Sequence, residues 1–280
     1  MQDPRSAHPT LTEKELDVIE ILKLSFSTLK KSWAISLGVP AVISILYILF
    51  SYFQMLEILE NLGSQPANPE DPFPGLDKIF RPFDLTVWLS SLVMLFLLYL
   101  SMIFPMRAAV RTLELRPLSS SSLGRHAFIL FIATVLLSAG SLIGLVFCIL
   151  PGMAFLVAFL FVPAAIIVEE SGVGRAFSLA YRTFSVRKSK VLALALLLML
   201  ISGGFYFITI IPALIYYIYG LLTVIVNGSP DMLPEFLRNY VLLTHLGLVL
   251  ALPPSAGLVG HALIIAYANF KNFVPAGPEF

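Results

Sequence analysis

The chain has 280 residues, of which 58% are hydrophobic and 12% are charged, and its mean hydropathy is +0.89. Soluble domains usually carry about 25% charged residues, so this composition excludes an ordinary water-soluble globule. The 18 Lys and Arg nearly balance the 17 Asp and Glu, so no bulk basic field favours nucleic acid as a partner. The single cysteine, Cys148, lies in an apolar run and offers no disulfide framework or thiol cluster for a metal.

Residues 1–31 precede the first long apolar run and contain an amphipathic pattern. Thr12 and Glu15 have the spacing of a capping box, so we expect a helix to begin there. Its predicted apolar face consists of Leu16, Ile19, Leu22, Phe26, Leu29 and Trp33. Charged side chains on the opposite face predict a cytoplasmic helix that lies in the inner membrane interface.

Long uncharged runs follow, and a helix needs about 20 apolar residues to cross the hydrocarbon core of a membrane. The predicted spans are residues 32–56, 85–106, two within 127–168, 191–217 and 239–270. The predicted fold class is therefore all-α, a polytopic transmembrane helical bundle with about six spans and cytoplasmic interfacial helices. We expect residues 1–280 to form one integral membrane domain, with the bundle at 32–270 and a cytoplasmic tail at 271–280.

Proline and glycine predict where these runs bend. The Pro151-Gly152 pair lies near the middle of the run 127–168 and predicts the turn between spans three and four. Residues 218–230 are expected to form an interfacial segment after span five. Pro253 and Pro254 are expected to kink or break span six, because proline removes a helical hydrogen bond.

The basic residues are distributed unequally between the segments that connect the spans. With the N-terminus inside, fifteen of the 18 Lys and Arg fall in inner segments and three in outer ones. Basic residues favour the cytoplasmic side of a membrane, so we expect both termini in the cytoplasm. The first ten residues are polar, and no signal peptide is visible before the first span.

Two adjacent carboxylates, Glu169 and Glu170, end the fourth span, and a second amphipathic helix is predicted directly after them with Ser171 as its N-cap. We expect the pair to favour the positive end of this helix dipole and to pair with Arg175 or another base nearby. A proton-handling or ligand-binding role for the pair is the alternative. Candidate residues for binding lipid or a protein partner are Lys30, Lys31, Arg175, Arg182, Arg187, Lys188 and Lys190.

Few residues at membrane depth carry chemistry. No Asp, Glu, Lys or Arg lies within the predicted spans, and no catalytic motif occurs, so we expect no enzyme, cofactor or metal site. His245 and His261 are the only imidazoles at depth, and their separation along span six is too large for a shared metal. A hydrogen-bonded packing role is expected for both, with a place on a substrate path as the alternative.

Two further patterns concern packing and the membrane surface. Gly140 and Gly144 form a GxxxG motif, which predicts close helix packing, with homodimerisation as the alternative. Tyr216, Tyr217 and Tyr219 close span five and predict an aromatic belt at the outer interface. A stacking platform for an aromatic ligand is the alternative, although the sequence shows no polar partner for it.

The segment Leu150 to Leu200 and the order of elements along nearly the whole chain resemble a prokaryotic family, the glycerophosphoryl diester phosphodiesterase membrane domain. The resemblance is carried by Pro151-Gly152, Pro163, Glu169, Val173, Ala176, Lys188 and the late motif AYANFKN. It implies a six-span domain of the prokaryotic cytoplasmic (inner) membrane, concerned with lipids or with membrane-associated partners. The catalytic barrel of the fused family members does not occur in these 280 residues, so phosphodiesterase activity is not implied.

These patterns favour a non-enzymatic scaffold or accessory subunit that docks a partner or anionic lipid at the cytoplasmic face. The alternative is a permease, exporter or lipid-handling protein for a hydrophobic or amphipathic substrate, favoured by the prolines of span six and by Gly203 and Gly204 in span five. The lipid bilayer, anionic lipids and a protein partner or second copy are the expected partners. A lipid-modifying enzyme is the least favoured class, because catalytic acids at depth are absent.

Overall fold

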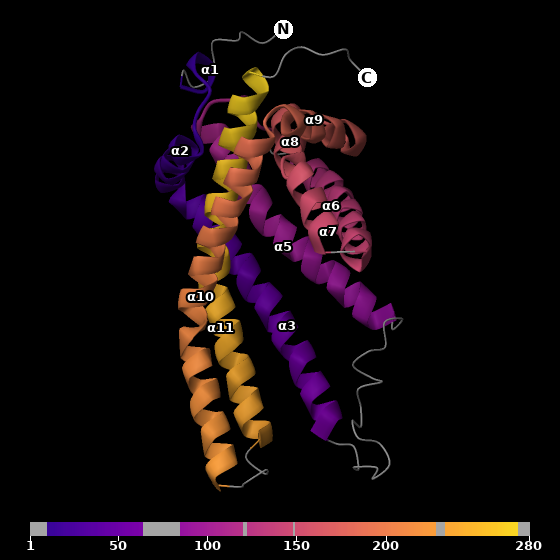
Figure 1. Ribbon diagram of the computed structural model, residues 1–280, viewed down its shortest axis with the longest axis vertical. Coiled ribbons are helices and arrows are strands. Elements are labelled where there is room, and N and C mark those ends of the chain that lie inside the picture. The colour runs from indigo at the N-terminus through magenta and orange to yellow at the C-terminus, as the bar shows by residue number, and fades with distance from the viewer. Residues whose placement is uncertain (1–9, 64–84, 120–121, 148, 228–232, 274–280) are drawn as a thin grey trace. The chain divides into compact units, whose positions relative to one another are not determined.

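The computed structural model describes residues 10–63, 85–119, 122–147, 149–227 and 233–273, and over these residues the chain is helical with no strand. The all-α class is confirmed. The helices are α1 Thr10–Glu13, α2 Val18–Lys31, the π-helix η2 Ala34–Gly38, α3 Val39–Gly63, α5 Leu85–Thr112, α6 Ser122–Phe147, α7 Ile149–Ala158, α8 Val162–Glu169, α9 Val173–Val186, α10 Lys188–Asn227 and α11 Leu233–Asn272 (Figure 1).

The chain divides into two compact units, each built from segments that are distant in the sequence. Unit 1 contains residues 1–40, 99–202 and 253–280, and unit 2 contains residues 41–98 and 203–252. The two units are described separately below. The expectation of one integral membrane domain over the whole chain stays a prediction.

Within the described part of the chain, five helical segments are long and apolar enough to cross a membrane by their length and composition. They are Ala34–Phe53, Ser122–Ser141, Leu150–Glu169, Lys188–Thr223 and Glu235–Asn272. Many of their large apolar side chains point outward, as lipid-facing side chains do. The chain is therefore a helical protein of the multi-pass membrane class. The second predicted span lies in α5, which is not among the five, so the six-span count stays a prediction.

The predicted N-terminal helix is wrong in its boundaries. The chain forms the short helix α1 and then leaves helical geometry, and α2 begins only after Asp17. The backbone N–H of Asp17 donates to Glu20 Oε2 at 3.0 Å, and Lys14 forms an ion pair with the same carboxylate at 2.6 Å. The Glu20 carboxylate thus accepts a hydrogen bond from the N-cap backbone. The capping box is therefore at residues 17–20, not at Thr12–Glu15.

The uncharged run 127–168 forms three helices instead of two. Pro151 and Gly152 lie within α7, where proline is tolerated because backbone N–H groups of a first turn have no intrahelical acceptor. The turn predicted at this pair is therefore wrong, because both residues are helical. An additional break at residues 159–161 separates α7 from α8, and Pro163 stands in the first turn of α8.

The two last helices are each 40 residues long and unbroken. Residues 218–227 continue α10, so the separate interfacial segment predicted at 218–230 is wrong over its described part. Pro253 and Pro254 lie inside α11 without ending it, so a break is wrong, and the kink that was expected as the other outcome stays a prediction. Each proline removes one backbone donor, and the other hydrogen bonds of a long helix are enough to keep it continuous.

The core of unit 1 is formed by α8 and the last part of α11. Residues 162–167 of α8 and 260–270 of α11 are all buried. A helix that is apolar on every side is stable only when other elements surround it. This packing places the residues that follow α8, and those that end α11, at the boundary between the apolar core and the polar end of unit 1.

The GxxxG face of α6 packs against α7 within the same chain (Figure 1). A Cβ atom at Gly144 would lie 2.7 Å from Gly152 Cα, and one at Gly140 would lie 2.5 Å from the Phe155 ring. Both distances are shorter than a van der Waals contact. The two glycines therefore allow the close approach of α6 and α7, which is what the packing interpretation of the motif requires.

We predict that Gly144→Ala destabilises the protein by about 1–3 kcal/mol, because the new methyl group meets the backbone of α7 and neither can move aside. The measurement is thermal unfolding of the purified protein in detergent. Gly124→Ala, in the first turn of α6, is the matched control, because the space around its Cβ position is open. Equal stability of the two variants would contradict the packing of α6 on α7.

Candidate functional site

Two segments from opposite ends of the chain meet at the polar end of unit 1 through the side chain of Asn269. This amide is fully buried near the end of α11. Its Oδ1 accepts from the backbone N–H of Leu16 at 2.8 Å, and its Nδ2 donates to the carbonyls of Leu11 at 3.1 Å and Lys14 at 2.9 Å. Asn269 therefore satisfies backbone groups that the break between α1 and α2 leaves without helical partners.

Ion pairs join the same N-terminal segment to the start of α10. The carboxylate of Glu15 lies 2.8 Å from Arg187 and 3.0 Å from Lys190, and Lys190 also lies 3.7 Å from Asp17. Arg187 donates a further hydrogen bond to the carbonyl of Phe273 at 3.0 Å. Two of the predicted lipid-binding residues, Arg187 and Lys190, are thus committed to contacts within the chain.

The two carboxylates after α8 have separate partners. Glu169 forms an ion pair with Lys271 at the end of α11, and Glu170 forms one with Arg116 at 2.8 Å. Arg175, the first partner that the sequence predicted, is exposed instead. Glu170 has a left-handed backbone (φ 51°), and this residue turns the chain between α8 and α9.

The predicted N-cap of α9 is also wrong. Gly172 is the N-cap of this helix, and it contributes no side-chain hydrogen bond. The hydroxyl of Ser171 donates to the carbonyl of Ala165 at 3.1 Å. Ser171 is buried, and its side chain therefore satisfies an acceptor in the preceding helix α8 rather than the first amides of α9.

The remaining predicted basic residues differ in exposure. Lys30 and Lys31 at the end of α2, Arg175 on α9 and Lys188 at the start of α10 are exposed. No ion pair joins any of these four to a carboxylate among the described residues. Arg182 on α9 is only partly exposed.

Helix α2 has two apolar faces, where the sequence predicted one. Its inward face consists of Ile21, Leu22, Ser25 and Thr28, which are buried. A second face is exposed and alternates apolar and basic side chains at helical spacing: Ile19 (63% exposed), Lys23, Phe26 (47%) and Lys30, with the exposed Trp33 (64%) two residues beyond the end of the helix. We call these five residues the α2 stripe. The predicted apolar face also included Leu16 and Leu22, but both of these side chains are buried in the core.

The two histidines of α11 have similar hydrogen bonds. His245 Nδ1 lies 2.7 Å from the carbonyl of Val241, and His261 Nδ1 lies 2.9 Å from that of Gly257. Because a carbonyl only accepts, both Nδ1 atoms carry the proton. The Nε2 atoms lie 3.0 Å from hydroxyls, of Ser51 in unit 2 and Ser32 in unit 1 respectively. This geometry agrees with the packing interpretation of both residues.

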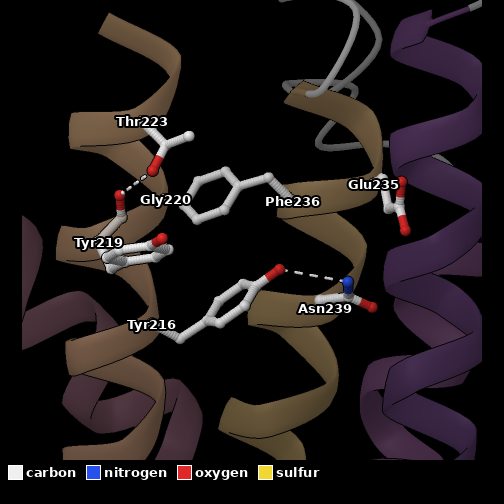
Figure 2. Close-up of a pocket in the computed structure, with 7 residues that line it drawn as sticks. All are labelled: Tyr216, Tyr219, Gly220, Thr223, Glu235, Phe236 and Asn239. Atoms are coloured by element: carbon white, nitrogen blue, oxygen red, sulfur yellow. Dashed lines mark hydrogen bonds between the residues drawn. The ribbon is translucent and has the colours of Figure 1, made fainter. Parts of the chain in front are cut away.

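Unit 2 contains an aromatic pocket between α10 and α11, with a cavity volume of about 210 Å³ (Figure 2). It is lined by Tyr216, Tyr219, Gly220, Thr223, Glu235, Phe236 and Asn239. The ring of Phe236 points toward Gly220, and a Cβ atom at position 220 would overlap this ring. The ring also stacks on Tyr216 at a centroid distance of 5.5 Å. Asn239 Nδ2 donates to the Tyr216 hydroxyl at 3.2 Å.

This pocket changes the interpretation of the tyrosines that close span five. The sequence offered no polar partner for a stacking platform, yet folding brings Asn239 beside Tyr216 from 23 residues away. Tyr219 remains exposed, as a belt residue would be.

Among the described residues, no three His, Cys, Asp or Glu side chains gather in an arrangement that could hold a metal ion.

Sequence reasoning missed the residue that organises the polar end of unit 1. Asn269 was quoted only as part of the motif AYANFKN, although an amide in an otherwise apolar run is costly unless it is hydrogen-bonded. That cost is the signal that could have identified it.

The fold and these contacts define a helical membrane protein, and comparison with known proteins adds no family to that class. No protein-family model, curated protein or solved structure matches the chain. The resemblance to the phosphodiesterase membrane domain stays a prediction.

We predict that Asn269→Leu lowers the free energy of unfolding by about 2 kcal/mol or more, because it removes the partner of the Leu16 N–H and of the Lys14 carbonyl and one of the two donors to the Leu11 carbonyl. Hydrogen exchange of the peptide covering residues 11–16 is the measurement, and exchange there should become faster than in the wild type. Asn272→Ala is the control, because Asn272 is exposed and donates one hydrogen bond to Leu11 O at 3.2 Å. Unchanged exchange in Asn269→Leu would show that these bonds do not hold the segment.

Proposed function

We propose that the chain is a non-enzymatic scaffold or accessory subunit of a prokaryotic cytoplasmic membrane, with both termini in the cytoplasm, that docks anionic lipid or a protein partner at its cytoplasmic face. The observation that carries the proposal is the α2 stripe together with the exposed cations Arg175 and Lys188. Large apolar side chains alternating with lysines are typical of helices that lie in the headgroup region of a membrane.

The distribution of ion pairs supports this proposal. Glu15, Glu169 and Glu170 are each paired with a base of the same unit, so their negative charges are largely compensated. The exposed lysines and arginines therefore face an outside partner with little competition from these carboxylates. A basic residue near an anionic leaflet contributes about 1 kcal/mol to binding.

The topology proposed from the sequence places the same residues on one side. The segment before span one contains the α2 stripe except Trp33, which is the second residue of that predicted span. The segments between spans four and five and after span six contain Arg175, Lys188 and Lys271. All of these segments are inner ones under the positive-inside rule. The resemblance to a membrane domain concerned with lipids or membrane-associated partners agrees with this arrangement.

The test is mass spectrometry of the protein extracted gently together with its native lipid. The wild type should retain a stoichiometric protein partner or an enriched anionic lipid. A variant with four substitutions, Lys30→Gln, Lys31→Gln, Arg175→Gln and Lys188→Gln, should lose most of it, because about 1 kcal/mol per charge amounts to several hundredfold over four charges.

The control keeps every charge and changes only side-chain shape: Lys30→Arg, Lys31→Arg, Arg175→Lys and Lys188→Arg. It should retain the wild-type partner or lipid. If the glutamine variant retains as much as the control, or if the wild type retains neither protein nor lipid, the docking proposal is refuted.

The aromatic pocket of unit 2 favours a second candidate function, the handling of a hydrophobic or amphipathic substrate. Its walls are aromatic, and its polar groups include the amide of Asn239 and the hydroxyls of Tyr216 and Thr223, whereas the Glu235 carboxylate points away from the rings (Figure 2). Aromatic faces suit a small amphipathic cation. Flux of such a cation into vesicles that contain this chain alone would support this candidate over the scaffold.

A further inference from the structure

One buried cation of unit 1 has no acidic partner. Arg107, near the end of α5, is 6% exposed, and no ion pair joins it to a carboxylate in the described part of the chain. Its Nη1 donates to Ser122 Oγ at 3.0 Å and to His126 Nδ1 at 3.0 Å, and its Nη2 donates to the Ser119 carbonyl at 2.7 Å. All three partners are uncharged groups.

The contact with His126 defines the state of that histidine. Because a guanidinium has only donors, His126 Nδ1 must accept, so the ring is not protonated there and adds no charge of either sign. Burial, together with the positive charges of Arg111 and Arg116, lowers the pKa of Arg107, and the negative charge of Glu170, which is paired with Arg116, offsets this only in part. Arginine nevertheless stays protonated in proteins. A buried positive charge without a directly bonded counter-ion is unfavourable, so the site favours an anion from outside the chain.

Two N–H groups of Arg107 remain for such an anion. A guanidinium carries five N–H donors, and three of those on Arg107 have acceptors among the described residues. Arg111 lies one helical turn further along α5, on the same face, and is exposed. Two guanidinium groups at this spacing suit a phosphate group, whose oxygens accept several hydrogen bonds at once.

A pocket of about 140 Å³ adjoins both arginines. It is lined by Ile35, Phe104, Arg107, Ala108, Arg111 and Leu123. The lining therefore combines two cationic side chains with four apolar ones. Sites that enclose a whole small molecule usually measure about 300–1,000 Å³. This pocket therefore has room for one small charged group and the start of an apolar chain, with the rest of the ligand outside.

We propose that this pocket binds the phosphate of one anionic phospholipid, with Arg107 and Arg111 as its hydrogen-bond donors. The apolar part of the lipid lies against Ile35, Phe104 and Leu123. Arg107 also holds the segment between α5 and α6 through Ser119 and Ser122, so the bound lipid stabilises this connection. The site is distinct from the exposed cations of the proposed function, and it can be occupied whether or not those cations dock a partner.

The experiment is native mass spectrometry of the purified full chain during titration with phosphatidylglycerol. The wild type should retain one lipid at low ratio, and Arg111→Gln should weaken this binding on the order of tenfold, as expected for one charged hydrogen bond. Arg111 is exposed, so its substitution leaves the fold intact. Arg107→Gln should also lose the lipid, but this variant additionally removes the bonds to Ser119 and Ser122.

Controls separate this site from the surface charges. Lys23→Gln, on the exposed face of α2, should bind the single lipid as the wild type does. The glutamine variant at Lys30, Lys31, Arg175 and Lys188 should also retain it, even if that variant abolishes docking. Loss of the single lipid in this variant but not in Arg111→Gln would overturn the site and leave the docking proposal standing.

Two further ligands test the assignment to an anionic lipid. Phosphatidylcholine carries the same phosphate without net charge and should bind more weakly. Inorganic phosphate should not displace phosphatidylglycerol at comparable concentration, because it lacks the apolar chain. Equal retention of phosphatidylcholine, displacement by inorganic phosphate, or equal affinity of wild type and Arg111→Gln would each overturn the proposal.

Discussion

The polar end of unit 1 depends on three hydrogen bonds made by one buried amide. Asn269 accepts from Leu16 and donates to the carbonyls of Leu11 and Lys14, so the segment before α2 is fastened to the last helix of the chain. In an apolar environment an unpaired backbone group is costly. This constraint fixes where α2 begins, and therefore which of its faces turns inward and which remains exposed.

The charged residues of unit 1 that were predicted to bind a partner, together with Glu15, divide into two groups. Glu15, Arg187 and Lys190 belong to ion pairs between partly buried side chains, which hold segments together. Lys30, Lys31, Arg175 and Lys188 are exposed. Of these two groups, only the second is free to meet a partner, so the number of basic residues in the sequence overstates the surface available for docking. Arg107 belongs to neither group, because it is buried without an acid.

Much of the fold could be predicted from the sequence, because long uncharged runs can only be helices in a membrane. The breaks were harder to predict. Two capping-box patterns occur before the first span, at Thr12–Glu15 and Asp17–Glu20, and local spacing does not distinguish them. The tertiary bonds of Asn269 hold the chain between α1 and α2 outside helical geometry, and the second pattern therefore begins the longer helix.

The pairings at the candidate site could not be predicted for a related reason. Glu169 and Lys271 are 102 residues apart, and Glu170 and Arg116 are 54 apart. Sequence spacing favours neighbours such as Arg175, whereas the actual partners depend on how α8 and α11 pack. The aromatic pocket is similar, because Asn239 reaches Tyr216 only after α10 and α11 lie side by side.

The central claim is that the α2 stripe lies in the headgroup region of the membrane, and Trp33 reports on it directly. The chain has two tryptophans, so Trp88→Phe leaves Trp33 as the single fluorophore. In vesicles containing phosphatidylglycerol, lipids brominated close to the headgroup should quench Trp33 more strongly than lipids brominated deep in the chains, and aqueous iodide should quench it weakly. Strong quenching by iodide with no effect of any brominated lipid would contradict the account.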